Sequence, residues 1–508
     1  MKPVSKNLIV IAGALLFNLI FWQEKLALNA ILFDLFILLS VFYLYPSTVR
    51  LSITRWLVPA HLVTLAAVII HNTLLSKIAF SATLLLVVVF AQYLHRSPWY
   101  ALASGLMNYV FAPGSLYSNA RLQGVATFNF SGLRAKLRVL VIPLMVVILF
   151  FVLYNFANTV FKELTNNFGQ VVSGWLKSLF GHFDGRRIGF LLWGLFITSG
   201  LLLKSRMNYF SERDNRQEDK LHRRKNDLRK WRQTSGFRLL SLLMGKLASG
   251  INALRNEYRT AIITLALLNG LLLCINCLDL IYVWFGFGYN SNINLSDYVH
   301  EGIGLLIFSI LMAMALLLFF FRGNLNFYNR NRWLILGAYA WLFQNAVLVV
   351  SVFLRDYYYI AHYGLTYKRI GVLIFLVLVL AGLVTVFIKI RVHKTAYFLW
   401  KLNAWIAILV LVVCSCVHWD EMIAQYNLAR RNIVVPDIAF LLTLSDKTLP
   451  ILDKNKALLN WPPAASRYYS PGQLFDMRKQ QFTQSQKGYS WLSWNWADYS
   501  TKKQLGIH

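Results

Sequence analysis

Long apolar stretches recur along the whole chain, and short polar segments separate them. Each stretch is close to the ~20 residues that an α-helix needs to cross the hydrocarbon of a bilayer. The pattern predicts eleven membrane-spanning helices, at about 7–22, 26–45, 56–75, 78–95, 137–160, 188–204, 260–285, 302–321, 333–353, 370–388 and 398–417. The predicted fold class is therefore all-α: a polytopic transmembrane helix bundle over residues 1–417, followed by a small C-terminal tail domain at 418–508.

Basic residues predict the orientation of this bundle. The chain has 51 Lys+Arg and 21 Asp+Glu, a formal net charge of +30, and only 14% of its residues are charged. With the N-terminus inside, every sizeable inside loop is basic, whereas the outside loop 286–301 contains no Lys or Arg. The expected topology is N-in and C-out, which makes 204–259 a basic cytoplasmic insert and 418–508 extracytoplasmic. Because topology accounts for the basic excess, we do not expect nucleic acid as a partner.

The second half of the insert places apolar residues at steps of three and four, which predicts an amphipathic helix over 236–256. Its apolar and basic positions are Leu240, Leu243, Leu247, Ile251, Leu254, Lys246 and Arg255. Two interpretations carry equal weight: the helix lies on anionic lipid headgroups near 204–259, or it packs on the protein's own cytoplasmic face. The lipid bilayer is the expected partner, and the sequence identifies no protein partner.

Two further regions are expected to be irregular. Glycine and proline interrupt the apolar pattern of 99–133, which predicts loop and interface structure there. Residues 461–508 are rich in Trp, Tyr, Gln and Ser. Their tryptophans, Trp491, Trp494 and Trp496, could contact lipid or glycan, but packing within their own domain is the favoured interpretation.

Ionisable and amide groups inside a membrane are costly, so they are the first candidates for a functional site. The seventh predicted span carries Asn269, Asn276 and Asp279, which share one helix face. This candidate intramembrane polar site suits a cation or proton, although interhelical hydrogen bonding is the commoner use of such residues. Five other polar residues at depth each fit a helix–helix contact better: Asp34, His61, His71, Gln344 and Asn345.

Other chemistry has weaker support. The pairs Cys274/Cys277 and Cys414/Cys416 would suit thiol–disulfide exchange, but no hydrophilic loop presents them, and Cys is a common small residue in spans. Six residues could meet on the outer face and bind zinc, without the spacing of a zinc site: His300, Glu301, His362, His418, Asp420 and Glu421. We find no catalytic or nucleotide-binding motif, and no cofactor is expected.

Several longer motifs carry a resemblance. They are NEYRTAIITLALLNGLLLCINCLDLIYVW at 256–284, SDYVHEGIGLL at 296–306, YGLTYKRIGV at 363–372, and IAQYNLARRN at 423–432 followed by PDIAFLLTLSDKTLPIL. From about 137 to 450 the chain resembles a bacterial multi-pass family without an assigned activity, domain of unknown function 4173 (DUF4173). The resemblance implies a bacterial cytoplasmic-membrane protein with several spans.

Three functional hypotheses follow. The first is a non-enzymatic envelope sensor, scaffold or assembly factor, which links the cytoplasmic insert to the outer tail. The second is a transporter of a small solute or ion that uses the seventh span, and a broken helix or cavity at Asp279 would favour it. The third is a membrane enzyme acting on a lipid or thiol, which a His and carboxylate cluster in an outer cleft would favour.

Overall fold

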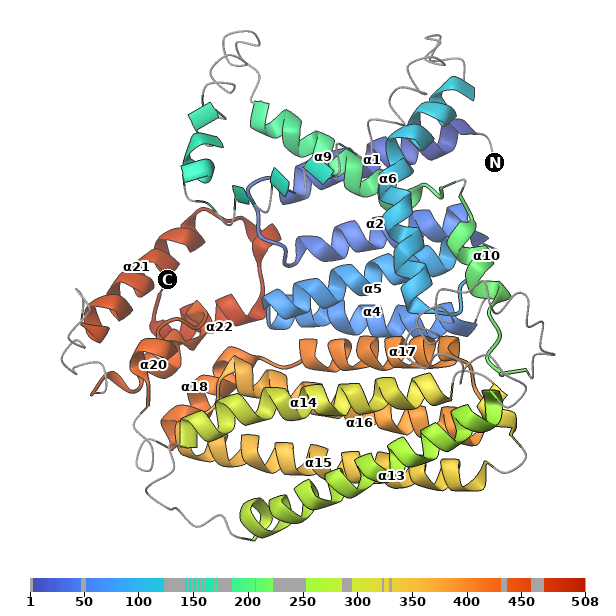
Figure 1. Ribbon diagram of the computed structural model, residues 1–508. Coiled ribbons are helices and arrows are strands. Elements are labelled where there is room, and N and C mark those ends of the chain that lie inside the picture. Colours follow the sequence, from blue (N-terminus) through green and yellow to red (C-terminus); the bar gives the residue numbers. More distant parts are fainter. Residues whose placement is uncertain are drawn as a thin grey trace.

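The computed structural model describes residues 3–46, 52–122, scattered positions within 143–170, 185–205, 207–222, 253–285, 295–321, 324–328, 331–430, 436–457 and 470–507. Over these residues the elements are helices, and none of them is a strand, so the all-α prediction is confirmed. The long helices lie side by side in a stack, with their ends at two opposite sides of the molecule (Figure 1).

Six of the described helices are long and apolar enough to cross a membrane: Ile53–Ile70, Leu74–Gln92, Leu254–Trp284, Arg332–Tyr363, Tyr367–Arg391 and Ala396–Ser415. Three shorter apolar helices are Lys6–Phe21, Asn29–Leu44 and Gly304–Phe320. These segments indicate a membrane protein, while the number eleven and the N-in, C-out topology stay predictions. Most of the predicted span 137–160 and of the amphipathic helix 236–256 lies outside the described residues.

The first half of the chain builds one group of packed helices, here called the first bundle. Its members are α1 (Pro3–Phe21), α2 (Asn29–Leu44), α4 (Ser52–Ile70), α5 (Leu74–Gln92), α6 (Pro98–Leu122) and α9 (Gly185–Leu202). Helix α1 packs along α9, and α4 packs along α5. Helix α5 lies at the centre, because Leu86 to Val89 have no exposed surface.

The expectation that 99–133 is loop is wrong for its described part, because α6 is a continuous helix of 25 residues. Gly105 is a contact residue here: a Cβ at this position would lie 2.9 Å from Leu85 Cδ1 of α5. Small residues allow such close approach between membrane helices. Pro113 sits inside the helix without ending it. Residues 123–133 are outside the described part.

The second bundle consists of α13 (Ala253–Asp279) with the π-helix η2 (Leu280–Trp284), α14 (Leu295–Phe320), α15 (Arg332–Tyr363) and α16 (Tyr367–Arg391). Helix α17 (Ala396–Ser415) joins the two bundles, since it packs on α16 on one side and on α4, α5 and α6 on the other. In Figure 1 it crosses the middle of the stack.

The described beginning of the predicted cytoplasmic insert is docked on the protein. Helix α10 (Tyr209–Arg216) packs against α6, and residues 217–222 run along the turn at 392–395 before α17. Leu221 N donates to His393 O at 2.8 Å, and Thr395 N donates to Asp219 O at 3.1 Å. The insert therefore starts at the end of the stack that lies opposite the C-terminus (Figure 1).

The tail, defined as residues 418–507, is largely helical where it is described, so the expectation of irregular structure after 461 is wrong for residues 470–507. Its elements are α18 (Trp419–Ala429), α19 (Ile438–Leu441), η4 (Asp446–Thr448), α20 (Leu449–Asp453), α21 (Pro471–Lys487), η6 (Trp491–Ser493) and α22 (Trp496–Leu505). Ser470 and Gln473 form a capping box at the start of α21, and Asn495 caps α22. The tail has its own apolar core, which also includes Ile360 and Ile370 from the ends of α15 and α16.

Candidate functional site

The predicted intramembrane residues lie in a polar seam between α13 and α15. Asn269 Nδ2 donates to Gly337 O at 3.1 Å, and Gln344 Nε2 returns a bond to Asn269 Oδ1 at 2.8 Å. One helical repeat further on, Asn276 Nδ2 donates to Gln344 O at 3.1 Å. The structure therefore brings these side chains together as interhelical hydrogen bonds, the commoner use of amides in membranes.

Asp279 ends the seam in an ion pair with Arg355 of α15. Both side chains are buried, with 5% and 8% of their residue surface exposed. The π-helix η2 begins at the next residue, and Trp284 Nε1 donates to Ser351 Oγ at 3.0 Å. Within the described part, Asp279 Oδ2 and Asn276 Oδ1 have no hydrogen-bond partner. Because the Arg355 guanidinium neutralises the Asp279 carboxylate, a structural role accounts for Asp279 without any bound cation.

The other polar residues at depth also find partners. His61 bridges two helices, with Nε2 at 2.8 Å from Asp34 Oδ1 and Nδ1 at 2.9 Å from Thr83 Oγ1. All three residues are at most 2% exposed. Asn345 donates to Trp341 O within its own helix. His71 differs from these residues, because it faces a cavity.

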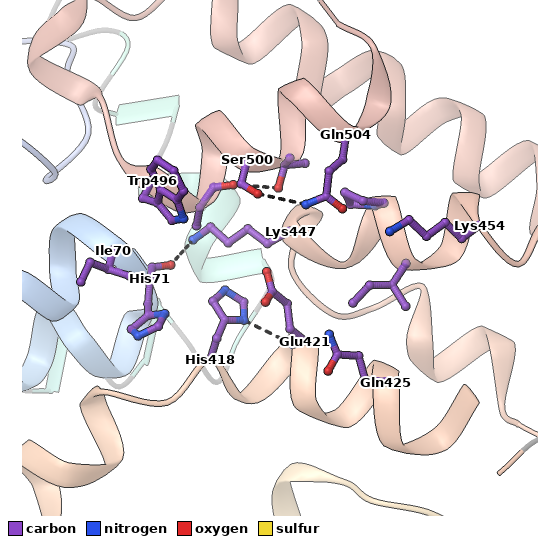
Figure 2. Close-up of a pocket in the computed structure, with 14 residues that line it drawn as sticks. Ile70, His71, His418, Glu421, Gln425, Lys447, Lys454, Trp496, Ser500 and Gln504 are labelled. Atoms are coloured by element: carbon purple, nitrogen blue, oxygen red, sulfur yellow. Dashed lines mark hydrogen bonds between the residues drawn. The ribbon is translucent and has the colours of Figure 1, made fainter. Parts of the chain in front are cut away.

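That cavity, here called the cleft, has a volume of about 270 Å³ and lies where the tail meets the ends of membrane helices (Figure 2). The end of α4, α18, the η4–α20 segment and α22 all contribute to its walls. Its lining residues include Ile70, His71, His418, Glu421, Gln425, Lys447, Pro450, Ile451, Lys454, Trp496, Ser500 and Gln504. Polar and apolar side chains from four segments thus converge on one space, as in small-molecule sites.

Lys447 connects the tail to the first bundle across the cleft. Its Nζ donates to the carbonyl oxygens of His71 at 2.9 Å and Asn72 at 2.7 Å. No carboxylate of the described residues lies within ion-pair distance of this ammonium. Burial lowers the pKa of Lys447 to about 8, so the group still carries its positive charge at pH 7.

His418 presents a hydrogen-bond donor to the same space. Its Nδ1 accepts the backbone N–H of Glu421 at 3.3 Å, which caps α18 and assigns the proton of the neutral ring to Nε2. That nitrogen is buried and has no partner among the described residues. In Figure 2 it points toward the space between Lys447 and His71.

Burial sets the protonation of the groups around His418. It lowers the pKa of His418 to about 4, and Lys447 adds to this shift, so the ring is neutral at pH 7. Burial also lowers the pKa of His71, whose ring centroid lies 5.8 Å from that of His418. Glu421 shifts in the opposite direction, because burial raises the pKa of its carboxyl group.

The predicted zinc cluster does not form in the described part of the chain, where no three His, Cys, Asp or Glu side chains could hold a metal together. His418 and Glu421 lie in the cleft, whereas Asp420 accepts a hydrogen bond from Tyr367 at 2.5 Å. The side chains of His300 and Glu301 are outside the described part. All four cysteines are free thiols.

Lys447 is the residue that the sequence analysis missed. It lies in the quoted motif PDIAFLLTLSDKTLPIL. The apolar residues on both sides of it are the only signal in the sequence that this lysine is half-buried. The three tryptophans of the tail are only partly covered by the protein. Trp491, Trp494 and Trp496 have 67%, 40% and 53% of their surface exposed. Two of these rings still contact Tyr499 of the tail, with centroid distances of 6.3 Å for Trp494 and 5.7 Å for Trp496.

A second polar cluster, here called the clasp, lies at the opposite end of the stack. Asp214 of α10 accepts from His95 Nδ1 at 3.0 Å, Tyr397 OH at 2.5 Å and two backbone amides, Arg96 N at 2.7 Å and Ser97 N at 3.2 Å. His95 Nε2 lies 2.9 Å from Ser104 Oγ.

Ser104, His95 and Asp214 are connected by hydrogen bonds in the way that the residues of a hydrolase triad are, but they are buried. All three residues are at most 4% exposed, so no substrate reaches Ser104 unless the helices separate. Burial raises the pKa of Asp214, but the hydrogen bonds from His95 and Tyr397 outweigh it and lower the pKa below its usual value. We therefore assign the clasp a structural role.

Comparison with known proteins gives a family without an assigned activity. Residues 10–455 match the family described as domain of unknown function DUF4153, and the chain therefore belongs to it. The number predicted from the sequence, 4173, is a different one, whereas the broader prediction of an uncharacterised membrane family agrees. No curated protein and no solved structure matches the chain.

Proposed function

We propose that this protein is a receptor-like sensor of the bacterial cytoplasmic membrane, with eleven spans and its tail outside. The ligand site is the cleft, and the protein needs no catalytic step. The single observation that carries this proposal is the shared wall of the cleft: His71 belongs to the first bundle, whereas Lys447 and Trp496 belong to the tail. A ligand that contacts both parts stabilises the state in which they are joined.

The contacts at the two ends support the proposed topology. The bond from Lys447 to His71 O keeps the tail beside the turn that follows α4, at the end that the N-in count places outside. The ion pairs of Asp219 with Arg96 and Lys401 join two segments that the N-in count assigns to the cytoplasm to the inner end of the last predicted span. Cysteine labelling tests this: residues introduced at 293 and 480 should react from outside, and one at 218 only from inside.

The sensor proposal is tested by a thermal-shift screen on the full-length protein in mild detergent. Small anionic, neutral and cationic solutes and a short-chain phospholipid are compared on the wild type and on Lys447→Met. We expect at least one class to raise the apparent unfolding temperature of the wild type but not of the variant. Hydrogen exchange should then slow in both 70–73 and 496–505, because the ligand joins the two segments.

Lys456→Met is the matched control for this screen. Lys456 is a nearby lysine of the tail, its side chain is 65% exposed, and it pairs only with Asp453 at 3.1 Å in the described part of the chain. It should behave as the wild type does. If neither a solute nor the phospholipid distinguishes Lys447→Met from Lys456→Met, the cleft is not the ligand site and the proposal fails.

A second function, transport of a proton or small cation, is favoured by one observation. Helix α13 changes to a π-helix directly after Asp279, and such changes are frequent at functional sites. Proteoliposomes with an internal pH dye test it. Flux that Asp279→Asn abolishes would establish transport, whereas the absence of flux in the wild type would leave the seam with a structural role.

A further inference from the structure

The cleft lies at the depth where two candidate spans end. The span in α4 ends at Ile70, which lines the cleft, and the span in α17 ends at Ser415, three residues before His418. The boundary of the hydrocarbon therefore passes beside this cavity. Lipid headgroups occupy the interfacial layer just outside that boundary.

The tail turns an aromatic surface toward the same layer. Trp491, Trp494, Trp496 and Tyr499 are between 40% and 67% exposed. Trp496 also lines the cleft. Trp494 O accepts the N–H of Leu28 at 3.1 Å, which holds this surface against the loop between α1 and α2. Tryptophan and tyrosine favour membrane–water interfaces, because their rings are apolar and carry one polar group.

Two donors in the cleft have free hydrogen-bonding capacity. Lys447 spends two of its three N–H groups on carbonyl oxygens, and His418 Nε2–H has no acceptor among the described residues. Two nearby carboxylates already have donors, since Asp420 accepts from Tyr367 and Asp498 accepts from Asn495 at 2.9 Å. Glu421 also lines the cleft, and burial raises the pKa of its carboxyl group, which favours the neutral form that can itself donate. An anionic oxygen is the complement of such a site.

We propose that the cleft binds the phosphate group of a membrane phospholipid, with the Lys447 ammonium and His418 Nε2–H as donors. The volume of about 270 Å³ is near the lower end of small-molecule sites, which suits a headgroup whose acyl chains stay in the bilayer. Ile70 and Ile451 supply an apolar wall for the glycerol carbons. This inference rests on the proposed function, because it names the ligand class of the same cleft.

Native mass spectrometry of the full-length protein, titrated with dioleoyl phosphatidylglycerol, tests the proposal. Lys447→Met should weaken binding of the tightest lipid at least tenfold, because it removes the charge that faces the phosphate. Lys456→Met is again the control and should leave that affinity unchanged. Equal affinities in the wild type and Lys447→Met would overturn the proposal, since the lipid would then be bound elsewhere on the bundle.

His418→Asn keeps the test decisive if Lys447→Met fails to fold. Asparagine is a favourable N-cap residue, so α18 keeps an acceptor for the Glu421 amide, while its shorter side chain withdraws the donor from the cleft. We expect a loss of about threefold or more in lipid affinity with an unchanged unfolding temperature of the lipid-free protein. An unchanged affinity in this variant would contradict the assignment of His418.

Soluble probes separate the lipid from a free anion. Inorganic phosphate and glycerol 3-phosphate are added to the lipid-free protein, and hydrogen exchange at 70–73 and 496–505 is followed. Protection by phosphatidylglycerol but not by these probes supports the lipid. Protection by the soluble probes alone overturns it in favour of a dissolved phosphate ester. Protection only by a cationic or neutral solute overturns the phosphate inference but leaves the sensor proposal intact.

Discussion

The clasp and the cleft are both polar clusters that join distant parts of the chain, yet their hydrogen bonding differs. Asp214 in the clasp accepts four hydrogen bonds and has no exposed surface. In the cleft, by contrast, His418 Nε2 has no described partner and Lys447 is held by carbonyl oxygens alone. A buried polar group without a partner is costly, so a native site that retains one has a reason other than stability.

This difference in hydrogen bonding distinguishes a structural cluster from a binding site, whereas the residue types alone do not distinguish them. Both clusters contain a histidine, a carboxylate and a lysine or arginine nearby. The clasp has all the residues of a catalytic triad, but closed packing prevents any reaction there. The cleft has an open volume beside its unsatisfied donors, and it is therefore where a ligand recovers the missing hydrogen bonds.

The largest expected effect comes from breaking the clasp. Asp214→Ala removes the acceptor of four hydrogen bonds and leaves His95 and Tyr397 with buried groups that have lost their partner. We expect the free energy of unfolding to fall by about 3–5 kcal/mol. Denaturation by SDS in mixed micelles measures it.

Glu212→Ala is the control for this variant, because Glu212 lies in the same helix with its side chain 61% exposed. Its effect should stay within about 0.5 kcal/mol. If lipid binding by the cleft also disappears in Asp214→Ala while the protein remains folded, the two clusters are coupled, and the distinction between structural and binding cluster breaks down.

The seam between α13 and α15 offers a second, slightly smaller effect. Asp279→Leu or Arg355→Leu alone leaves one buried charge without its partner, whereas the double variant leaves none. We expect each single variant to lose about 3 kcal/mol and the double variant to lose clearly less than their sum. SDS unfolding of all three variants completes the cycle. Additive losses would mean that the pair is not coupled, and that Asp279 has another partner.

The sequence predicts the helical class and much of the seam. Apolar runs of membrane length mark α4, α5 and α15 to α17, because the hydrocarbon requires such runs whatever the packing. The spacing of Asn269 and Asn276 by seven residues places them on one face. The sequence cannot identify Gln344 as the partner of Asn269 or Arg355 as the partner of Asp279, because contacts between helices depend on how the helices pack.

The cleft and the tail lie beyond what patterns along the chain can show. His71 and Lys447 are 376 residues apart, and no periodicity relates them. The tail has the composition of a loop, yet it folds into helices because local caps at Ser470 and Asn495 start them. Gly105 led to the wrong prediction of a loop in 99–133, because glycine destabilises an isolated helix. In the folded protein this glycine leaves space for Leu85 of the neighbouring helix.

A third prediction concerns acid sensitivity at the cleft. His418 has a pKa near 4 when folded, against an ordinary value of 6.5. The unfolded chain therefore binds the proton first, and stability falls as pH drops from about 6.5 to about 4, by on the order of 2 kcal/mol. The pKa of His71 is lowered as well, so its protonation adds to this loss of stability. The pKa of Glu421 is raised, so its protonation offsets part of the loss.

The wild type and His418→Asn are compared between pH 7 and pH 4 by thermal unfolding of the full-length protein. The difference between the two curves cancels the contributions of His71 and Glu421, which both proteins share. We expect the wild type to lose more stability than His418→Asn over this interval. Parallel curves would show that His418 is not buried in its neutral form, and the cleft would then be more open than the structure shows.

The smallest effect belongs to the ion pair between Lys25 and Asp498, which fastens the tail to the loop between α1 and α2 at 3.5 Å. Lys25 is 28% exposed, and pairs of this kind contribute at most about 1 kcal/mol. Lys25→Met should therefore lower stability slightly, and 1 M salt should remove the difference, because charges are then screened within about 3 Å. The corresponding change at the other end, Lys401→Met, breaks a similarly half-exposed pair with Asp219 and should be equally mild. Buried polar groups with complete hydrogen bonding hold the two ends of this molecule together, and opposite charges alone do not. A loss of stability for Lys25→Met as large as that for Asp214→Ala would contradict this.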